Sequence, residues 1–442
     1  MIGKATKRLT ALISLFSIIF SLTLPAAAVE PLPDTSEAKS VYLWNAEYDK
    51  AIISKSEGTI FPASTVKIMT GLVAIDLIGT RLDEKVTISA EMLLGNQGTR
   101  LPLTEGEVVS FRDLLYAAIC GGFNDAANAL AVASAGSTSQ FVAKMNEKAK
   151  ELGAKDTNYT NPTGWHDEGM VTTLHDTALI CKAAMKNELY VTVSSASSYV
   201  VPKNNKSDKF TVHNRNGLIG SHYTYGYRNQ KAKGLIAGMT DEGGHCVATF
   251  FESDGLTYLC VVMGATESEN EINSYKIANS LISYVSYYYG TVDAIKSGQV
   301  ITSVPVGLAV STTEDYYMLD CTAPSKVSVL APYDRASLEN IELVPYFFSE
   351  EITAPIKKGD VIGGVDIFID GVLSGNADLC ASEDVSANTV LATMEGAKNL
   401  LVSRAFIIFF IVFSILFALY FFFFELHDLR KKDKKIRFDR IY

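Results

Sequence analysis

Ser64 and Lys67 stand three residues apart at the start of an apolar run, in the stretch FPASTVKIMT (residues 61–70). On a helix, residues i and i+3 share a face, so Lys67 could take the proton of Ser64 if burial or a neighbouring cation lowered the pKa of its amine. The S-x-x-K spacing therefore indicates a nucleophilic serine with a lysine base. A serine at a helix start is also a common N-cap, because its hydroxyl satisfies free backbone N–H groups. The tetrapeptide alone leaves both interpretations open.

The histidines and cysteines show no spacing that is typical of a metal site. The chain has no H-E-x-x-H pattern and no C-x-x-C pattern among its six scattered cysteines, and these are common signatures of zinc binding. We therefore expect neither a metal nor a cofactor. The cysteines lie mostly in apolar surroundings, which favours packing over disulfide pairing. Asp125 and Asp176 suit helix capping or structural hydrogen bonds.

The elements around Ser64 follow the order strands, helices, strands. The stretch SVYLWNAEYDKAIIS predicts two paired strands, and a second hairpin is expected around Ser253-Asp254-Gly255. Helix-like apolar spacing extends over residues 65–79, 111–134 and 138–152. This order predicts a mixed sheet flanked by helices, in one domain over residues 38–293.

The two ends of the chain carry targeting and membrane signals. Residues 1–28 have the basic, apolar and small-residue parts of a signal peptide. Residues 297–390 have the rhythm of a small all-β domain, and a short connection, roughly 385–404, follows it. The uncharged segment 405–424 is long enough to cross a bilayer. The basic tail 425–442 predicts a cytoplasmic C-terminus, with the main domains extracellular.

Composition narrows the class of protein further. The chain has 442 residues, a hydrophobic fraction of 48% and a formal net charge of −10. These values allow a sizeable hydrophobic core and exclude a mainly disordered chain. The acidic body also argues against a nucleic-acid partner.

Four longer stretches make the pattern around Ser64 far more specific. They are, in chain order, FPASTVKIMTGLVAID, LPLTEGEVVSFRDLLYAAICGGFNDAANALA, FVAKMNEKAKELGAKDTNYTNPTGWHD and LCVVMGA. In order and spacing they resemble the low-molecular-mass penicillin-binding proteins of the serine D-alanyl-D-alanine carboxypeptidase family, and APIKKGDVIGGVDIF resembles the β-rich C-terminal domain of that family. With the apolar C-terminal segment, the resemblance implies an α/β (α+β) penicillin-binding/β-lactamase-like domain, a small all-β domain and one transmembrane helix.

The resemblance implies acyl transfer at Ser64. The family serine attacks the carbonyl between the last two D-alanines of a peptidoglycan stem peptide, releases D-alanine, and is then freed by water. Carried onto this sequence, Ser64 is the nucleophile and Lys67 the base. The backbone N–H groups of Ser64 and Met239 would form the oxyanion hole, which stabilises the developing negative charge. The implied substrate-binding residues are Gly238, Met239 and Thr240.

Two motifs of the family are degenerate in this chain. The S-x-N motif aligns with Gly122-Phe123-Asn124, which keeps the catalytic asparagine, Asn124, and lacks the serine hydroxyl. The K-T-G motif aligns with Ile236-Ala237-Gly238, so Ile236 replaces the cation that faces the substrate carboxylate in the family. Lys231 and Lys233 lie nearby, but neither has a glycine two residues on.

Three functions fit these observations. The first is a membrane-anchored D,D-carboxypeptidase that trims peptidoglycan peptides and is open to inhibition by β-lactams. The second is a catalytically impaired relative that binds peptidoglycan or a partner protein, which the replacements at Gly122 and Ile236 favour. The third, a β-lactamase, fits the long C-terminal part and the membrane segment less well. The family resemblance favours the carboxypeptidase, with a peptidoglycan peptide and the membrane as its partners.

Overall fold

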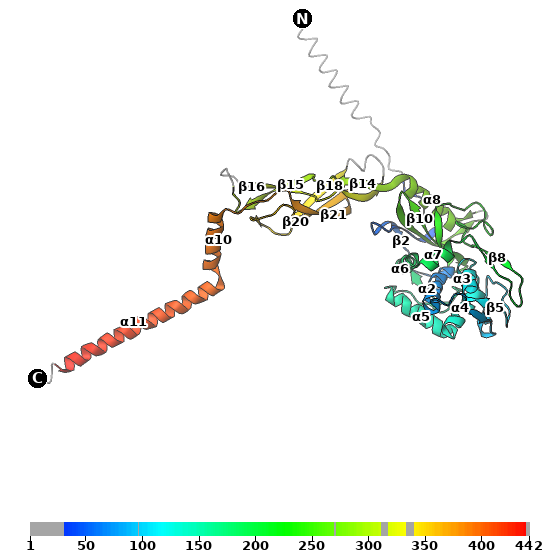
Figure 1. The fold of residues 1–442 in the computed structure, drawn as a ribbon, viewed down its shortest axis with the longest axis horizontal. Helices are drawn as coiled ribbons and strands as arrows, with labels where there is room; N and C mark the ends of the chain where they lie inside the picture. Colours follow the sequence, from blue (N-terminus) through cyan, green and yellow to red (C-terminus); the bar gives the residue numbers. More distant parts are fainter. Residues whose placement is uncertain (1–30, 96, 269–270, 311–316, 333–339, 439–442) are drawn as a thin grey trace, which may run out of the picture. The chain divides into compact units, whose positions relative to one another are not determined.

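The computed structural model describes residues 31–438 except 96, 269–270, 311–316 and 333–339 (Figure 1). The predicted signal peptide, 1–28, lies outside the described residues. The chain divides into two compact units, the first ending at Val292 and the second beginning at Asp293, with a short later segment from Val329 belonging to the first. The boundaries expected for separately folding domains, 38–293 and 297–390, stay a prediction.

A five-stranded antiparallel sheet forms the frame of the first unit. In spatial order its strands are β2 (Lys50–Lys55), β1 (Ala38–Asn45), β11 (Leu256–Ala265), β10 (Gly244–Ser253) and β9 (Ala232–Thr240). Both predicted hairpins, β1–β2 and β10–β11, are confirmed. Each neighbouring pair is antiparallel, so the expectation of a mixed sheet is wrong. Apolar patterning indicates which segments are strands but does not fix their direction.

Helices and short strand pairs complete the first unit. The helices are α2 (Val66–Ile78), α3 (Phe111–Ile119), α4 (Asn124–Ala135), α5 (Thr138–Glu151), α6 (Leu174–Met185), α7 (Glu188–Ser195) and α8 (Asn273–Tyr288), with the 3-10 turns η1 (Ala63–Thr65) and η2 (Glu91–Leu93). The short pairs are β3 (Thr59–Ile60) with β6 (Thr172–Thr173), β4 (Lys85–Thr87) with β5 (Val108–Ser110), β7 (Ser198–Val201) with β8 (Phe210–His213), and β12 (Glu267–Ser268) with β13 (Glu271–Ile272).

One predicted helix is in fact two. The apolar spacing over residues 111–134 continues through the break between α3 and α4, where Gly122 has a φ of +67°. A residue with positive φ cannot continue a right-handed helix. The break places Gly122 and Asn124 at the start of α4 rather than within a longer helix.

Buried hydrophobic side chains pack on both faces of the five-stranded sheet. Successive side chains of a strand point to opposite faces. Along β11, Leu259 and Val261 pack into the core formed with helices α2 to α7, whereas Cys260 and Val262 pack against α8. Burial on both faces explains why LCVVMGA is apolar without alternation.

The second unit is built from strands, which confirms the predicted small all-β domain. Its main sheet has the order β18 (Ile341–Phe347), β20 (Val361–Ile369), β21 (Val372–Ala381), β16 (Tyr317–Thr322), β15 (Val300–Gly307) and β19 (Ile352–Thr353). Two further strands, β14 (Tyr289–Ile295) and β17 (Val327–Pro332), pair with each other in a two-stranded sheet.

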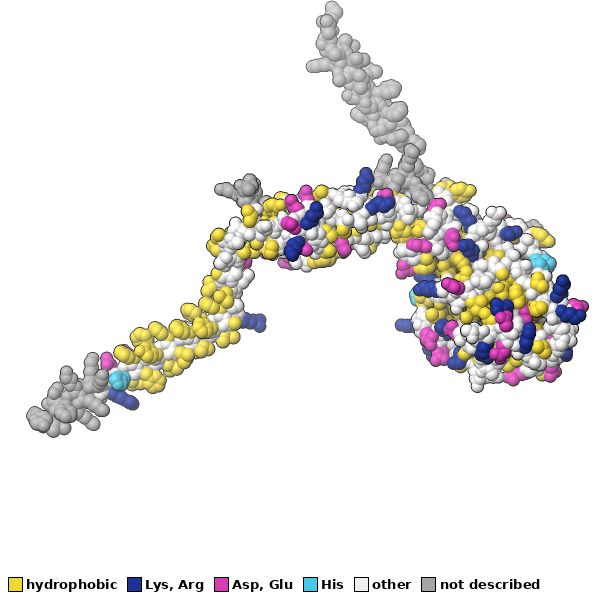
Figure 2. Space-filling model, viewed as in Figure 1, with side chains coloured by type: hydrophobic (Ala, Val, Ile, Leu, Met, Phe, Trp, Pro, Cys, Tyr) yellow, Lys and Arg dark blue, Asp and Glu magenta, His cyan; other side chains and the backbone are white. Residues whose placement is uncertain are grey.

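Two helices end the chain. The segment expected to be a connection, 385–404, contains the helix α10 (Thr389–Val402), and α11 (Arg404–Phe438) follows it. Within the described residues, the part of α11 from Arg404 to Arg430 is the one helix long and apolar enough to cross a membrane. Figure 2 shows hydrophobic side chains along its visible length. The predicted span, 405–424, falls inside this range.

Candidate active site

Ser64 lies in the 3-10 turn η1, immediately before α2. Thr65 and Pro62, rather than Ser64, occupy the cap positions of α2 and η1, and neither makes a side-chain cap hydrogen bond. The helix-cap interpretation of Ser64 is therefore wrong. The preceding residue, Ala63, has a φ of +48°, in the left-handed region that costs an L residue free energy. Backbone strain of this kind concentrates at functional sites, and here it lies at the residue directly before Ser64.

The amine of Lys67 lies 3.2 Å from the Ser64 hydroxyl oxygen. The same nitrogen donates to the backbone carbonyl of Thr163 at 2.6 Å, which fixes its position. The Lys67 side chain is fully buried. Burial, and secondarily the positive charge of Arg215, lower its pKa from 10.5 to about 7. Near neutral pH much of the amine is therefore uncharged and able to accept a proton from the serine.

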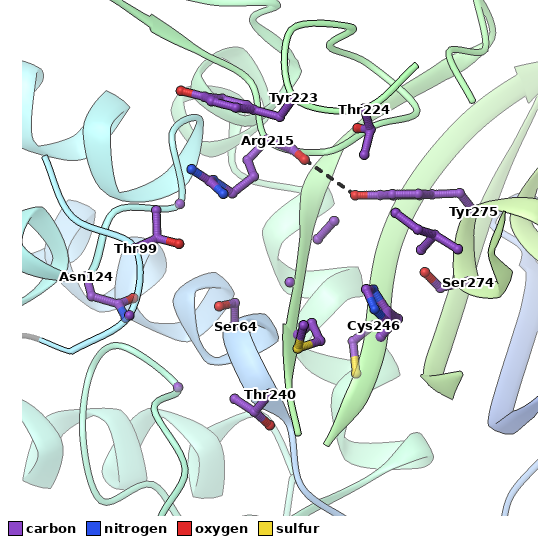
Figure 3. A pocket seen from close by; sticks show the side chains of 18 of the residues that line it. Ser64, Thr99, Asn124, Arg215, Tyr223, Thr224, Thr240, Cys246, Ser274 and Tyr275 are labelled. Atoms are coloured by element: carbon purple, nitrogen blue, oxygen red, sulfur yellow. Dashed lines mark hydrogen bonds between the residues drawn. The ribbon is translucent and has the colours of Figure 1, made fainter. Parts of the chain in front are cut away.

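A pocket of about 290 Å³ opens above Ser64 (Figure 3). Five of the other residues predicted for the site line it, namely Gly122, Asn124, Gly238, Met239 and Thr240. Lys67 is buried and does not itself line the pocket, and Ile236 is buried in the core on the helix side of the sheet. The structure thus brings the predicted residues together around the serine, except that Ile236 does not line the pocket.

Asn124 offers an unused hydrogen-bond acceptor at the pocket. Its side-chain nitrogen donates to the carbonyl of Gln97 at 2.6 Å, while its side-chain oxygen is buried and has no hydrogen-bond partner among the described residues. A buried polar atom without a hydrogen-bond partner costs free energy unless a ligand supplies the missing hydrogen bond. The oxygen of Asn124 can accept from an N–H group of a molecule in the pocket.

Strand β9 forms the opposite wall of the pocket. Any side chain at Gly238 would overlap the side chain of Ser64, so only glycine allows the strand to run so close to the serine. Met239 is the next residue and is 47% exposed. Thr240 accepts a hydrogen bond from the Gly243 amide at 3.0 Å. The middle position of the K-T-G alignment, Ala237, lines the pocket without a hydroxyl.

Arg215 supplies the cation in this pocket, and the sequence analysis did not find it. Its side chain passes next to Gly122, where an added Cβ would lie 3.2 Å from the arginine Cδ. The guanidinium carbon lies 4.4 Å from the ring centroid of Tyr223, and the arginine Nε donates to the Gly121 carbonyl at 3.3 Å. The Asn-rich stretch VHNRN was the available signal, but a loop sequence does not show where its side chain points.

The two lysines near the K-T-G position are engaged elsewhere. Lys231 donates to the hydroxyls of Ser253 and Ser286, and Lys233 pairs with Glu252 at 2.7 Å. Neither lines the pocket. A lysine has therefore not replaced the missing family lysine, and the nearby positive charge comes from Arg215.

The remaining polar candidates have structural partners. Asp125 accepts from the backbone amides of Leu101 and Leu103, and Asp176 accepts from the Asp156 amide, as predicted. All six cysteines are free and buried, so the preference for packing over pairing is confirmed. Cys246 lines the pocket, but burial raises the pKa of its thiol to about 11.

The fold of this chain is similar to that of solved penicillin-binding proteins and carboxypeptidases. The penicillin-binding protein 5 of Haemophilus influenzae covers 81% of the chain, with a TM-score of 0.56, 22% identity and its own full length matched. The D-alanyl-D-alanine carboxypeptidase DacD of Francisella tularensis covers 83%, with a TM-score of 0.63, 22% identity and 98% of its length matched. At these identities the likeness concerns the fold.

Sequence comparison identifies the family. Residues 26–267 match the D-alanyl-D-alanine carboxypeptidase family, and residues 289–387 match the C-terminal domain of penicillin-binding protein 5. The carboxypeptidase DacF of Bacillus subtilis is 28% identical over 353 residues, 79% of this chain and 86% of its own. DacC of Escherichia coli is 26% identical over 383 residues, 84% and 90% of the two chains. The chain belongs to the D-alanyl-D-alanine carboxypeptidase family, as its motifs predict.

Proposed function

We propose that this protein is a membrane-anchored serine D-alanyl-D-alanine carboxypeptidase that cleaves peptidoglycan stem peptides through an acyl-serine intermediate. The observation that carries the proposal is the buried amine of Lys67, 3.2 Å from the Ser64 hydroxyl and with its pKa lowered to about 7. A serine hydroxyl is a weak nucleophile until a base removes its proton. Lys67 is such a base at neutral pH.

The reaction has two acyl-transfer steps. In the first, the Ser64 oxygen attacks the carbonyl between the two D-alanines while its proton passes to Lys67. The C–N bond then breaks, and the leaving amine of D-alanine takes up a proton from Lys67 or from water exchanging with it, which leaves Lys67 neutral again. In the second, water attacks the ester while its proton passes to Lys67, and the serine oxygen leaves with that proton. The backbone amides of Ser64 and Met239 stabilise the oxyanion formed in each step.

Two side chains position the peptide. The unpartnered oxygen of Asn124 accepts a hydrogen bond from a backbone N–H of the substrate. Arg215 binds the terminal carboxylate, because a guanidinium presents paired donors to a carboxylate. Its contact with Tyr223 holds the guanidinium in place before substrate arrives. Arg215 thus replaces the binding part of the role that the K-T-G lysine has in the family.

The site lacks a proton relay to the leaving amine. Gly122 brings no hydroxyl and Ile236 no amine, so the leaving group depends on Lys67 or on water. A general acid–base group contributes about 10²–10⁴-fold in rate, and we expect turnover to be slower than in a complete site by a factor of that order. An impaired relative that mainly binds the wall peptide is the second candidate, and the same two positions favour it.

The proposed anchor is the apolar part of α11, with the main domains before it extracellular. The basic residues after the span, including Arg430, favour a cytoplasmic C-terminus. Protease added to intact cells is expected to digest the extracellular part and to spare a C-terminal fragment. Protection of the whole chain would contradict this orientation.

The enzymatic proposal is tested by following both steps separately. The purified protein is incubated with a fluorescent penicillin, and the mass of the Ser64 peptide is measured. We expect slow covalent labelling that Ser64→Ala abolishes and Ser195→Ala leaves unchanged, because Ser195 lies in α7 and does not line the pocket. D-alanine release from a pentapeptide is measured in parallel and is expected to be slow. Labelling without any release favours the binding protein, and labelling of Ser64→Ala would refute the proposed nucleophile.

A further inference from the structure

An exposed sheet face in the second unit carries a tyrosine ring and three polar side chains. The proposed reaction at Ser64 uses none of them. Strands β18, β20 and β21 pair antiparallel, so residues opposite one another point to the same side. On the inner side, Val365, Ile367 and Leu379 are fully buried. The outer side is formed by two rows across the three strands, which we call the Tyr346 face: Val344, Asp366 and Asn376 in one row, and Tyr346, Gly364 and Asp378 in the other.

The ring of Tyr346 lies against the sheet. A Cβ added at Gly364 would overlap the ring atoms of Tyr346, so the absence of a side chain at Gly364 lets the ring cover the backbone there. The tyrosine is nevertheless 44% exposed. One surface of the ring thus covers the sheet, and the rest is available to solvent. Phe348 continues the aromatic surface, with ring centroids 6.2 Å apart.

Three polar side chains on the same face of the sheet are not engaged in side-chain contacts. Asp366, Asn376 and Asp378 make no side-chain hydrogen bond or ion pair with any residue that the structure describes. Asn376 and Asp378 are exposed and Asp366 is partly so. Two carboxylates and an amide therefore offer free acceptors on both rows beside an aromatic surface. The six residues of the face include no lysine or arginine.

We propose that the Tyr346 face binds the glycan strand of peptidoglycan. A sugar ring has an apolar surface of C–H groups that packs on an aromatic ring, and its hydroxyl and acetamido N–H groups donate to carboxylate and amide oxygens. The carboxylates disfavour an anionic partner. The choice of glycan rests on the proposed function, because the polymer whose stem peptides reach Ser64 is a chain of N-acetylated amino sugars. The face holds that polymer by its sugars, and the pocket processes its peptides.

Binding is measured with the full-length protein in detergent micelles and a tetramer of β-1,4-linked N-acetylglucosamine as the probe, by calorimetry. We expect saturable binding that Tyr346→Leu weakens by about tenfold or more, as removal of a central aromatic contact does. Leucine keeps an apolar side chain on this strand, and thermal melting checks that the variant keeps its fold. Asp378→Ala is expected to weaken binding without touching the ring. The matched control is Tyr287→Leu, the same change at a tyrosine that is 76% exposed on α8.

Penicillin labelling of each variant separates this proposal from the proposed enzyme. Ser64→Ala is expected to bind the tetramer normally, and Tyr346→Leu to be labelled normally. Equal affinity of Tyr346→Leu and the unaltered protein would overturn the assignment, as would the absence of any binding. Binding of a lysine-rich peptide in place of the tetramer would also overturn it and indicate a basic protein partner. If the unaltered protein binds the tetramer and is not labelled by penicillin, the proposed enzyme is contradicted and the proposed glycan-binding face is supported.

Discussion

The pH dependence of serine acylation tests the central claim about Lys67. With a pKa of about 7, about half of the Lys67 amines are neutral at pH 7, against roughly 3 in 10,000 for a lysine at its ordinary value near 10.5. The lowered pKa thus raises the neutral, reactive fraction of the amine by about a thousandfold, with burial as the larger cause. The neutral form is the base, so activity is lost as pH falls through the lowered pKa. We expect the maximal acylation rate to fall about tenfold per pH unit below pH 6 and to level off above pH 8.

The cause of the lowered pKa can be tested with two variants of one residue. Burial is the larger cause and the charge of Arg215 the smaller. Removing that charge in Arg215→Gln is expected to move the inflection of the profile to higher pH, whereas Arg215→Lys keeps a positive charge and should keep most of the shift. Rapid-mixing measurements with a fluorescent penicillin give the maximal rate and the apparent affinity separately. If an Arg215 variant binds the carboxylate of the penicillin more weakly, the apparent affinity changes. The inflection in the pH profile of the maximal rate then still reports the pKa of Lys67.

Two results would refute this reasoning. A rate independent of pH between 5 and 9 would mean that Lys67 does not act as the base. A rate that rises only above about pH 9 would mean that the amine keeps the ordinary pKa of a lysine and that burial does not activate it. Lys67→Ala provides the baseline, and its folding is checked by thermal melting.

Three further outcomes follow from the packing of the first unit. Gly238→Ala should abolish penicillin labelling while the protein still melts cooperatively, because the new methyl group overlaps Ser64; normal labelling would contradict the close approach of β9. Gly122→Ser should lower the free energy of unfolding by about 1–2 kcal/mol without restoring the rate, because a serine at φ +67° is strained; denaturant titration measures this, and an unchanged midpoint would show that the strain is absent. A fragment of residues 30–293 should fold but melt below the full chain, because it lacks Leu330 from the core around α8; an unfolded fragment would show that the domain boundary is wrong.

The sequence predicts the chemistry of the serine well because that chemistry is local. Ser64 and Lys67 are three residues apart on one stretch, and their contact requires only one turn of helix. Gly238 is equally predictable, since its motif lies within one strand. Ile236 was expected at the site from the same motif, and the strand instead buries it in the core. Motif spacing orders positions along a strand, whereas packing decides which of them reaches the pocket.

Arg215 and the break at Gly122 could not be predicted, because both depend on tertiary structure. The apolar period runs on through residues 111–134, and nothing in it shows that the chain turns at Gly122. Arg215 lies in a loop beyond β8, and its direction is set by Tyr223 and by the space that Gly122 leaves. Strand direction in the main sheet was missed for a related reason, since apolar patterning does not fix the direction of strands that are far apart in the sequence.

The pairing of β1 with β11 has a consequence for how the protein is made. Ala38 pairs with Ala265 and Asn45 with Tyr258, so one of the first segments to be synthesised completes the sheet only with one of the later ones. At a translation rate of about 5–20 residues per second, β1 waits on the order of 10 to 50 seconds for its partner. Throughout that interval β1 has only β2 beside it, and its apolar side chains remain uncovered. Molecular chaperones that hold extended apolar chains are therefore expected to associate with the nascent protein until residue 265 has emerged.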